Sequence, residues 1–408
     1  MSIYAIADDL SGAAETAAAL AGLEKVSAHN AHRALPIAAV LDLYSAHEGQ
    51  DPLPTTPAGS GRIEVVDSGN RHVAGPEAAR RMRLLLAAKL QMSQVFLKFD
   101  SLLRGNIDVE LAAAMESRPM AFCPALPGLD RTVRNGVLEV SGRPLHKTSL
   151  WQAESAVPDR SISARLPGTS PSVVPLDVVR SAQLESALTA ITSEGRLAVC
   201  DAETAADLDR IAAAALRRGI SLAGAAGLAS AMARQSSSSP DTLTAPGDPA
   251  RVSKADVLFI LGTASKSTGP QLAELHQLGV PVHRLDPSGI LSFDPGPVGP
   301  AAIIVEGPID VSRSNDIVQS LAQLALRTHA GRHLVLSGGE TARTVLDTLG
   351  ITRLHPLAQA HPGAVVSVTD SGRLIATRPG SFGDRHSLAQ ILKTMHALEN
   401  ANFGKASS

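Results

Sequence analysis

Short apolar runs alternate with helix-like segments along nearly the whole chain. Residues 3–7, 95–98 and 120–123 are apolar at almost every position, which is typical of strands buried on both faces of a sheet. Alanine- and leucine-rich segments with helical spacing, such as 77–90 and 205–217, lie between runs of this kind. The alternation predicts an α/β fold in which a mostly parallel, doubly wound sheet is flanked by helices.

The length of the chain and one low-complexity segment predict two domains. At 408 residues, the chain exceeds the size at which a single hydrophobic core stops growing. Residues 236–249 contain four consecutive serines followed by three prolines and a glycine, which is typical of a linker. We predict one α/β domain over residues 1–238, a linker over 239–253 and a second α/β domain over 254–408. Further strands are predicted at residues 37–41, 63–66, 197–200, 257–261, 281–285, 301–305, 333–336 and 364–368.

Charge and apolar content argue against several classes of partner. The net charge is −2 and no basic stripe is present, which disfavours nucleic acid and anionic membranes as partners. No apolar run approaches the length of a membrane span, and the chain begins with a strand pattern, so we expect a cytoplasmic protein. Cys123 and Cys200 each end an apolar run and are predicted to be buried free thiols.

The segment 98–106, with the sequence KFDSLLRGN, carries the strongest functional signal. It stands where a predicted strand passes into a predicted helix, and ligands of open α/β sheets bind beyond the carboxyl ends of the strands. Arg104 suits a carboxylate or phosphate held by two hydrogen bonds, and Lys98 adds a point charge. The alternative is a surface ion pair that flanks a turn, which we consider less favoured than a ligand site.

Two other predicted strand ends carry similar side chains. Asp8 and Asp9 follow the first strand, and residues 67–71, DSGNR, follow the third. The paired carboxylates suit orienting hydroxyls, acting as a base or helping to hold Mg²⁺, while helix capping by Asp9 or Ser11 is the simpler alternative. A simple turn is the alternative for residues 67–71. Because parallel strands end at one edge of a sheet, the three ends together predict a site for a small polyoxygenated anion.

Three glycine-containing turns in the second domain predict a nucleotide cradle. Residues 337–341, SGGET, follow a strand and lead into a helix expected to begin at Thr341, so their backbone N–H groups suit a phosphate. A tight turn capped by Thr341 is the alternative. Residues 262–269 resemble a P-loop in composition only, and residues 379–383, PGSFG, form the third turn. No GxGxxG is present, which counts against a dinucleotide site.

These segments, in this order, resemble the family of four-carbon acid sugar kinases, which includes threonate, erythronate and 3-oxo-tetronate kinases. The matching segments are residues 7–13, 67–71, 98–106, 338–341 and 380–383. Some positions depart from the family pattern. Leu102 stands where the family usually has Thr, Leu129 and Asp130 intrude before Arg131, and Arg378-Pro379 replaces a usual Lys-Ser.

The resemblance implies an N-terminal acid-sugar-binding domain and a C-terminal ATP-binding domain. The implied reaction transfers the γ-phosphoryl group of ATP, with Mg²⁺, to the terminal 4-hydroxyl of a four-carbon sugar acid. Such transfer depends on positioning and charge neutralisation. The residues predicted to hold ATP are Ser265, Gly338, Gly339, Glu340, Thr341, Gly380 and Gly383. The metal ligands are left unassigned.

We predict roles for the polar residues of the first domain. Arg104, with Lys98 or Arg71, is expected to hold the substrate carboxylate. Asp100 and Asp8 are both candidates for the base, and the sequence does not decide between them. The catalytic set is predicted to be Asp9, Asp100 and Arg104, and the substrate hydroxyls are expected to contact Asp9, Ser101 and Asn106.

Two other functional classes stay open at this point. One is a non-catalytic sugar-acid sensor that binds its ligand between two α/β lobes. The other is an NAD-dependent oxidoreductase, which the missing glycine fingerprint disfavours. A homodimer is also left open by the sequence.

Overall fold

The computed structural model describes residues 2–23, 39–44, 63–89, 94–150, 159–235, 256–263, 268–296, 299–306, 314–380 and 383–403. The chain divides into two compact units, of which the first comprises Met1–Gly22 and Tyr44–Asp241. The second comprises Leu23–Leu43 and Thr242–Ser408. The excursion of residues 23–43 into the second unit was not predicted, and the predicted linker lies outside the described residues.

The first unit is built on a parallel sheet whose strands end at one edge. Ala7 at the end of β1 lies opposite both Asp67 of β3 and Lys98 of β4, and Lys98 also lies opposite Gly224 of β11. The three predicted polar strand ends are therefore in register. The strand order is β3 (Ile63–Asp67), β1 (Ile3–Ala7), β4 (Gln94–Lys98), β11 (Ser221–Gly224), β5 (Met120–Cys123), β10 (Ala198–Cys200) and β9 (Ser172–Val174).

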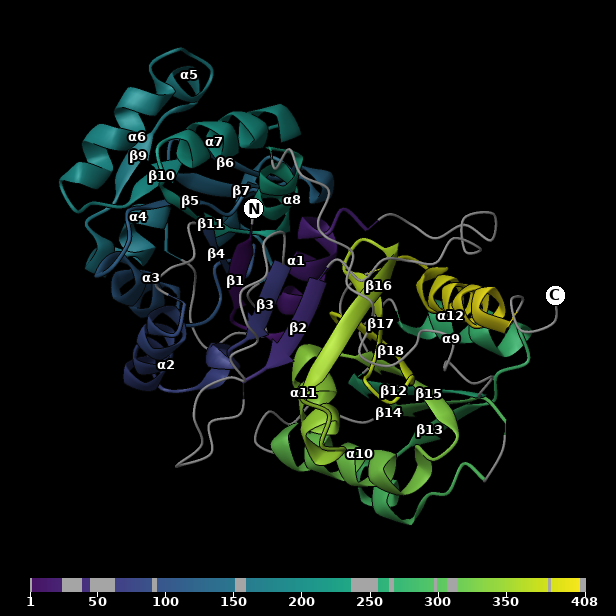
Figure 1. The fold of residues 1–408 in the computed structure, drawn as a ribbon. Coiled ribbons are helices and arrows are strands. Elements are labelled where there is room, and N and C mark those ends of the chain that lie inside the picture. The colour runs from purple at the N-terminus through teal and green to yellow at the C-terminus, as the bar shows by residue number, and fades with distance from the viewer. Residues whose placement is uncertain are drawn as a thin grey trace. The chain divides into compact units, whose positions relative to one another are not determined.

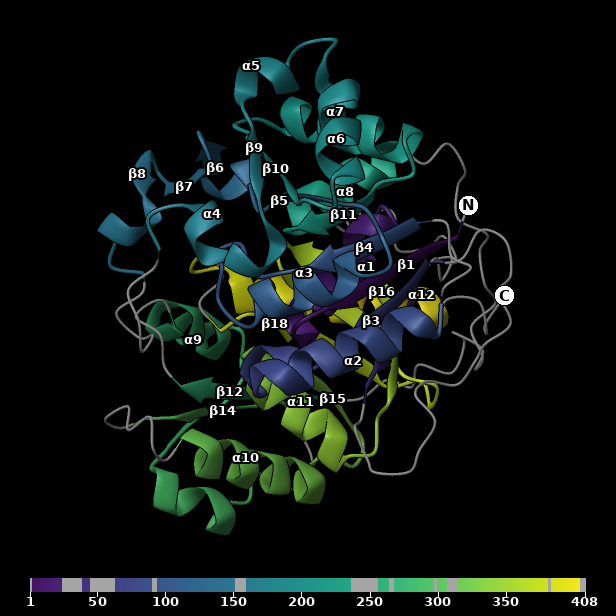
Figure 2. The ribbon, with the colours of Figure 1, turned by 90° about the vertical axis from the view of Figure 1, so that its left-hand side faces the viewer.

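Helices cover both faces of this sheet. Figure 1 shows α2 and α3 on one side of β1, β3 and β4, with α1 and α8 on the other. Figure 2 shows α2 and α3 side by side. This arrangement confirms the predicted doubly wound α/β fold. The helices are α1 (Leu10–Leu20), α2 (Gly75–Ala87), α3 (Ile107–Met115), α4 (Ile162–Arg165), α5 (Leu176–Val179), α6 (Leu184–Ser193), α7 (Ala205–Arg217) and α8 (Ala226–Gln235).

Buried aliphatic and aromatic side chains fill the space between the layers. Phe96 and Phe122 are fully buried on neighbouring parts of the sheet, and the thiols of Cys123 and Cys200 are buried and free, as predicted. The start of α7 is fixed by a capping box, in which the Thr204 side chain accepts from the Asp207 backbone N–H and the Asp207 side chain accepts from the Thr204 backbone.

A small antiparallel sheet in the first unit was not predicted. It comprises β6 (Arg131–Arg134), β7 (Val137–Val140) and β8 (Arg143–Pro144). The β6–β7 turn places Asn135 and Gly136 at positive φ, and the Asp201 carboxylate accepts from both of their backbone N–H groups, at 2.6 and 2.9 Å. This carboxylate therefore anchors the hairpin at the end of β10.

The sheet of the second unit is parallel from β13 to β18 and antiparallel beyond it. β16 and β18 were not among the predicted strands, and β2 pairs with β16 through Leu41 and Leu354. The strand order is β13 (Val282–Leu285), β14 (Ala301–Val305), β12 (Asp256–Thr263), β15 (Arg332–Ser337), β18 (Leu374–Arg378), β17 (Ala364–Val368), β16 (Arg353–His361) and β2 (Ala39–Leu43).

Four helices among the described residues accompany this sheet. In the second unit, α9 (Thr268–Gln277) packs against α12 (Ser387–Phe403). α10 (Ser314–Thr328) lies beside α11 (Gly339–Thr348) in both views (Figures 1 and 2). No helix of the described residues is long and apolar enough to cross a membrane.

Candidate functional site

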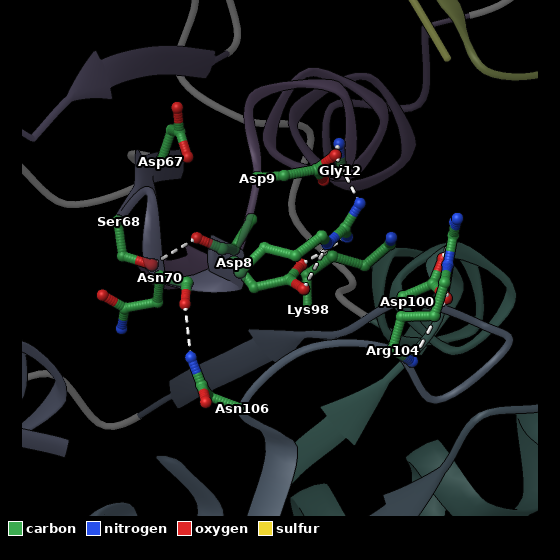
Figure 3. A network of polar contacts seen from close by, with 12 residues as sticks. Asp8, Asp9, Gly12, Asp67, Ser68, Asn70, Lys98, Asp100, Arg104 and Asn106 are labelled. Carbon is green, nitrogen blue, oxygen red and sulfur yellow. Dashed lines mark hydrogen bonds and ion pairs between the residues drawn. The ribbon is translucent and has the colours of Figure 1, made fainter. Parts of the chain in front are cut away.

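The polar residues at the ends of β1, β3 and β4 gather at one edge of the sheet (Figure 3). Asp8 and Asp9 lie between β1 and α1, and Arg71 lies just beyond β3. The Arg71 Nε and Nη2 atoms donate to the two carboxylate oxygens of Asp8, each at 2.8 Å, while Nη1 donates to Asp9 Oδ2 at 2.7 Å. Arg71 thus joins two of the three predicted segments through ion pairs.

The adjacent carboxylates of Asp8 and Asp9 have different environments. Asp9 caps α1, because its Oδ1 accepts the Gly12 backbone N–H at 2.8 Å, so capping and membership of the cluster coexist in one side chain. Asp8 is buried. Burial raises the pKa of Asp8, the charge of Arg71 opposes that shift, and the charge of Asp9 adds to it. The net effect is a pKa above the ordinary value for Asp.

Asp100 and Arg104 form a two-point ion pair in the segment between β4 and α3. Arg104 Nε donates to Asp100 Oδ2 at 2.7 Å and Nη2 donates to Oδ1 at 2.9 Å. The backbone N–H of Leu102 also donates to Oδ2, at 3.1 Å. Burial raises the pKa of Asp100, but the hydrogen bonds and charge of Arg104, with Arg71 and Lys98, outweigh burial and hold it below the ordinary value.

Lys98 and Ser101 also lie in this cluster, as predicted from the strand ends. The Lys98 Nζ atom is buried and stands 3.6 Å from the Glu15 carboxylate on α1. The Ser101 hydroxyl accepts a hydrogen bond from Arg131 of β6. Arg131 was not predicted as a site residue. The sequence marked it only as the position before which Leu129 and Asp130 depart from the family pattern, and no strand was predicted there.

Asn106 joins two loops in this structure. Its Nδ2 donates to the carbonyl oxygens of Asn70 and Val73, each at 2.8 Å. Behind these loops, Asn70 Nδ2 donates to Glu110 Oε2 at 2.7 Å. Burial raises the pKa of Glu110 to about 8, with a further contribution from the charge of Asp8. Sequence reasoning missed Glu110, because a charged residue in a helix is expected on the solvated face.

The glycine turns predicted in the second unit converge. The Gly338 backbone N–H donates to the Arg378 carbonyl at 3.0 Å, and a Cβ added at Gly380 would lie 3.7 Å from Gly338 Cα. A Cβ added at Gly262 would lie 2.8 Å from Thr341 Oγ1, so a side chain at residue 262 would require Thr341 to shift. Three segments that are far apart in sequence therefore approach one another at backbone distance.

The helix after the first of these turns begins at Gly339, two residues earlier than predicted. Gly338 is its N-cap at φ 100°, and no side chain caps the helix. Thr341 lies inside the first turn, so the alternative in which it caps the helix is wrong. The uncapped backbone N–H groups are suited to an anion. Glu340 lies in the same turn, Gly383 lies in the final glycine turn, and Ser265 lies outside the described residues.

A buried arginine connects the elements around these turns. Arg378 at the end of β18 is 1% exposed, and its Nε donates to Ser337 Oγ at 3.0 Å. Its Nη1 donates to Gln271 Oε1 on α9 at 2.9 Å and to Ser387 Oγ on α12 at 2.8 Å. Burial lowers the pKa of Arg378 to about 10, so the guanidinium stays charged at neutral pH.

The described residues include no group of three or more His, Cys, Asp or Glu side chains that suits a metal ion. In the first unit, both carboxylates of the Asp8-Asp9 pair are bound by Arg71. The described residues therefore do not form a protein cage for Mg²⁺. Mg²⁺ is commonly held by one or two carboxylates together with substrate phosphates, and Glu340 is the carboxylate nearest in sequence to the paired glycines.

Two family models match parts of this chain. Residues 3–232 match the model of a sugar-binding N-terminal domain, and residues 303–388 match that of a nucleotide-binding C-terminal domain. The chain is therefore a protein that combines these two domain types. It belongs to the family of four-carbon acid sugar kinases, because sequence similarity to named members extends over nearly its whole length.

The relatives carry two substrate names. A D-threonate kinase of Cupriavidus necator is 30% identical, and the alignment covers 97% of this chain and 98% of the relative. A 3-oxo-tetronate kinase of Methylobacterium radiotolerans is 28% identical over 97% and 99% of the two chains. The fold is similar to that of a Salmonella typhimurium protein of known crystal structure, with a TM-score of 0.74 and 22% identity over 96% of this chain and 98% of that chain.

Proposed function

We propose that this protein is an ATP-dependent kinase that phosphorylates the terminal 4-hydroxyl of a four-carbon sugar acid, such as threonate, erythronate or a 3-oxo-tetronate. The observation that carries the proposal is the pairing of two matches in one chain. The sugar-binding match includes the polar strand ends of the first unit, and the nucleotide-binding match includes the glycine turns around Gly338 and Gly380. A phosphoryl acceptor and a phosphoryl donor are the two ligands that a kinase needs.

In this proposal, the corner of the site around Arg104 holds the substrate carboxylate. Arg104 binds the Asp100 carboxylate by two hydrogen bonds, and Lys98 adds a buried positive charge. The substrate carboxylate would share or replace the contact with Asp100. Arg71 is held by Asp8 and Asp9, so its contact with substrate would require exchange of these ion pairs. Asp9, Ser101 and Asn106 would order the hydroxyls.

Asp8 is the better candidate for the base. Its pKa is raised by burial, whereas the pKa of Asp100 is held below the ordinary value by Arg104. A more basic carboxylate accepts a proton more readily from an attacking hydroxyl. In the proposed step, the substrate oxygen forms a bond to the γ-phosphorus, the bond to the ADP oxygen breaks, and the hydroxyl proton passes to Asp8.

The nucleotide phosphates would lie at the start of α11. The backbone N–H groups after Gly338 and the close approach of Gly380 leave room for phosphate oxygens. Arg378 would add buried positive charge behind the turn. Mg²⁺ would accompany the phosphates and neutralise their charge during transfer.

An ADP-release assay coupled to a reporter tests the proposal directly. The purified protein is supplied with ATP, Mg²⁺ and, in turn, threonate, erythronate and 3-oxo-tetronates, with erythritol as a neutral control. We expect ADP release that depends on one of the acids, and a 4-phosphorylated product by mass spectrometry and NMR. Binding of an acid without ADP release would favour the sensor alternative. Thermal stabilisation by NAD but not by ATP-Mg²⁺ would overturn the kinase assignment.

A further inference from the structure

Arg131 enters the first-unit site from an unpredicted direction. It begins β6, and its backbone exchanges two hydrogen bonds with Leu126, at 2.8 and 3.2 Å, directly after β5. Val133 on the same strand exchanges two more with Ala202, at 2.8 and 3.0 Å, directly after β10. Because β5 and β10 are parallel to the strands that carry the cluster, these bonds anchor the start of β6 at the edge where the polar strand ends meet.

The Arg131 side chain points to the predicted substrate residues. Its Nη1 donates to the hydroxyl of Ser101. Burial lowers the pKa of Arg131, the charges of Asp100 and Glu15 raise it, and the positive charge of Arg104 lowers it, so these groups are close enough to interact. Arg131 therefore places a second guanidinium in the corner that contains Arg104.

Arg134 shows that this orientation is specific. It lies three positions further along the same strand, and residues an odd number apart point to opposite faces of a strand. Its side chain is 60% exposed and pairs with Glu203, away from the cluster. One strand thus presents one arginine to the site and the other to solvent, which supplies a matched control.

We propose that Arg131 is a substrate-binding residue that, together with Arg104, recognises the carboxylate end of the sugar acid. This inference rests on the proposed function. Two guanidinium groups at one corner can hold a carboxylate by several charge-assisted hydrogen bonds, which a neutral polyol cannot accept with comparable strength. Arg131 acts as a determinant of acid over neutral sugar, and the turn at residues 127–130 sets its position.

Four variants of the full chain test this assignment: Arg131→Ala, Arg131→Gln, Arg131→Lys and the control Arg134→Ala. Arg131→Gln keeps an N–H donor for Ser101 without the charge, so it guards against a failure to fold, which thermal unfolding checks. Binding of threonate and erythronate is measured by calorimetry without nucleotide, and KM for acid and for ATP is measured by ADP release.

We expect Arg131→Ala and Arg131→Gln to weaken acid binding by about tenfold or more, since each removes a charge-assisted hydrogen bond. Arg131→Lys should recover part of the loss, and KM for ATP should stay within about twofold of wild type. Arg134→Ala should bind as wild type does. The inference is overturned if Arg131→Gln binds the acid as tightly as the wild-type protein does. It is also overturned if KM for ATP rises as much as KM for the acid, because that result would place Arg131 beside the phosphates.

The test separates this inference from the proposed function. If the wild-type protein binds acid but transfers no phosphate, only the kinase proposal is refuted, because the calorimetric comparison still decides the role of Arg131.

Discussion

Replacement of Arg104 should weaken substrate binding while the protein still folds. Its side chain is about a third exposed, and it contacts Asp100 within its own loop. We expect Arg104→Ala to raise KM for the acid by about 30-fold, equivalent to about 2 kcal/mol, because hydrogen bonds between charged groups are among the strongest. Steady-state kinetics measures the change. Arg80→Ala is the control, since Arg80 is exposed and pairs with Glu77 on α2. An unchanged KM for the acid would refute the role given to Arg104.

Glu110 should make the stability of the first unit depend on pH. Burial raises its pKa from 4.5 to about 8, so the folded protein keeps a proton there that the unfolded chain releases above about pH 4.5. The stabilisation is complete below pH 4.5, falls as pH rises toward 8 and then levels off. Glu110→Gln mimics the protonated form, so its unfolding midpoint should rise relative to wild type as pH is raised from 5 to 8.

The control for this experiment lies at the other end of the same helix. Glu116 at the C-cap of α3 is half exposed and pairs with Arg83. Glu116→Gln should show no such rise relative to wild type over the same pH range. A parallel pH dependence in wild type and Glu110→Gln would contradict the assignment of a protonated Glu110.

At the scale of elements, the two ends of α11 offer a test of the phosphate cradle. Gly338 before the helix and Gly350 after it both have positive φ, at 100° and 67°. Alanine at either position should cost about 1–2 kcal/mol of backbone strain. Only Gly338→Ala should also raise KM for ATP, because its methyl group would add bulk to the proposed phosphate site, in van der Waals contact with Thr341. Equal KM values for ATP in the two variants would remove the turn from the nucleotide site.

Arg378 connects β15, α9 and α12, so its replacement should affect the whole second unit. Arg378→Met removes the donor for Ser337, Gln271 and Ser387, and buried acceptors left without a donor cost about 1–3 kcal/mol each. We expect Arg378→Met to lower the unfolding midpoint, Arg378→Lys to lower it less, and the exposed control Arg327→Met on α10 to leave it unchanged. Scanning calorimetry measures the midpoint of each variant. A midpoint unchanged in Arg378→Met would show that these hydrogen bonds contribute little.

On the scale of the whole molecule, the two predicted ligands should protect different units. Hydrogen exchange followed by mass spectrometry on the intact chain measures this protection. ATP-Mg²⁺ should slow exchange in peptides that cover residues 337–341 and 378–380, and the acid should slow it over residues 67–71 and 98–106. The opposite pattern would reverse the assignment of the two domains.

The sequence predicted most of the parallel strands, because strands buried on both faces are apolar throughout. It missed the parallel strands β9, β11 and β18, which are only three to five residues long. β16 was missed because His355, Pro356 and Gln359 interrupt its apolar pattern, although most of the strand is buried. β6 was missed because its sequence, RTVR, is largely polar. A local sequence pattern predicts a strand only when its buried face is apolar. These two strands lack that pattern and are stabilised by partners that are distant in sequence.

The same reason explains which site residues were predicted. Polar residues directly after apolar strands could be found, because a parallel sheet brings such ends together without knowledge of any contact. Glu110, Arg131 and Arg378 act through partners 40, 30 and 107 residues away, and no local pattern reveals those pairings. The roles of these three residues could be assigned only from the three-dimensional structure.

The excursion of residues 23–43 has a practical consequence for dissecting the chain. The chain passes from the first unit to the second, returns, and passes to the second again, so no single cut separates the units. Cleavage after residue 241 would leave β2 on the N-terminal fragment, so β16 would lose one of its two neighbouring strands and the Arg353–Asp42 ion pair. An exposed strand edge can pair with other chains, so we expect the C-terminal fragment to aggregate when it is produced alone. A C-terminal fragment that begins with residues 39–43, joined through a glycine-serine linker, would restore that strand to its own sheet.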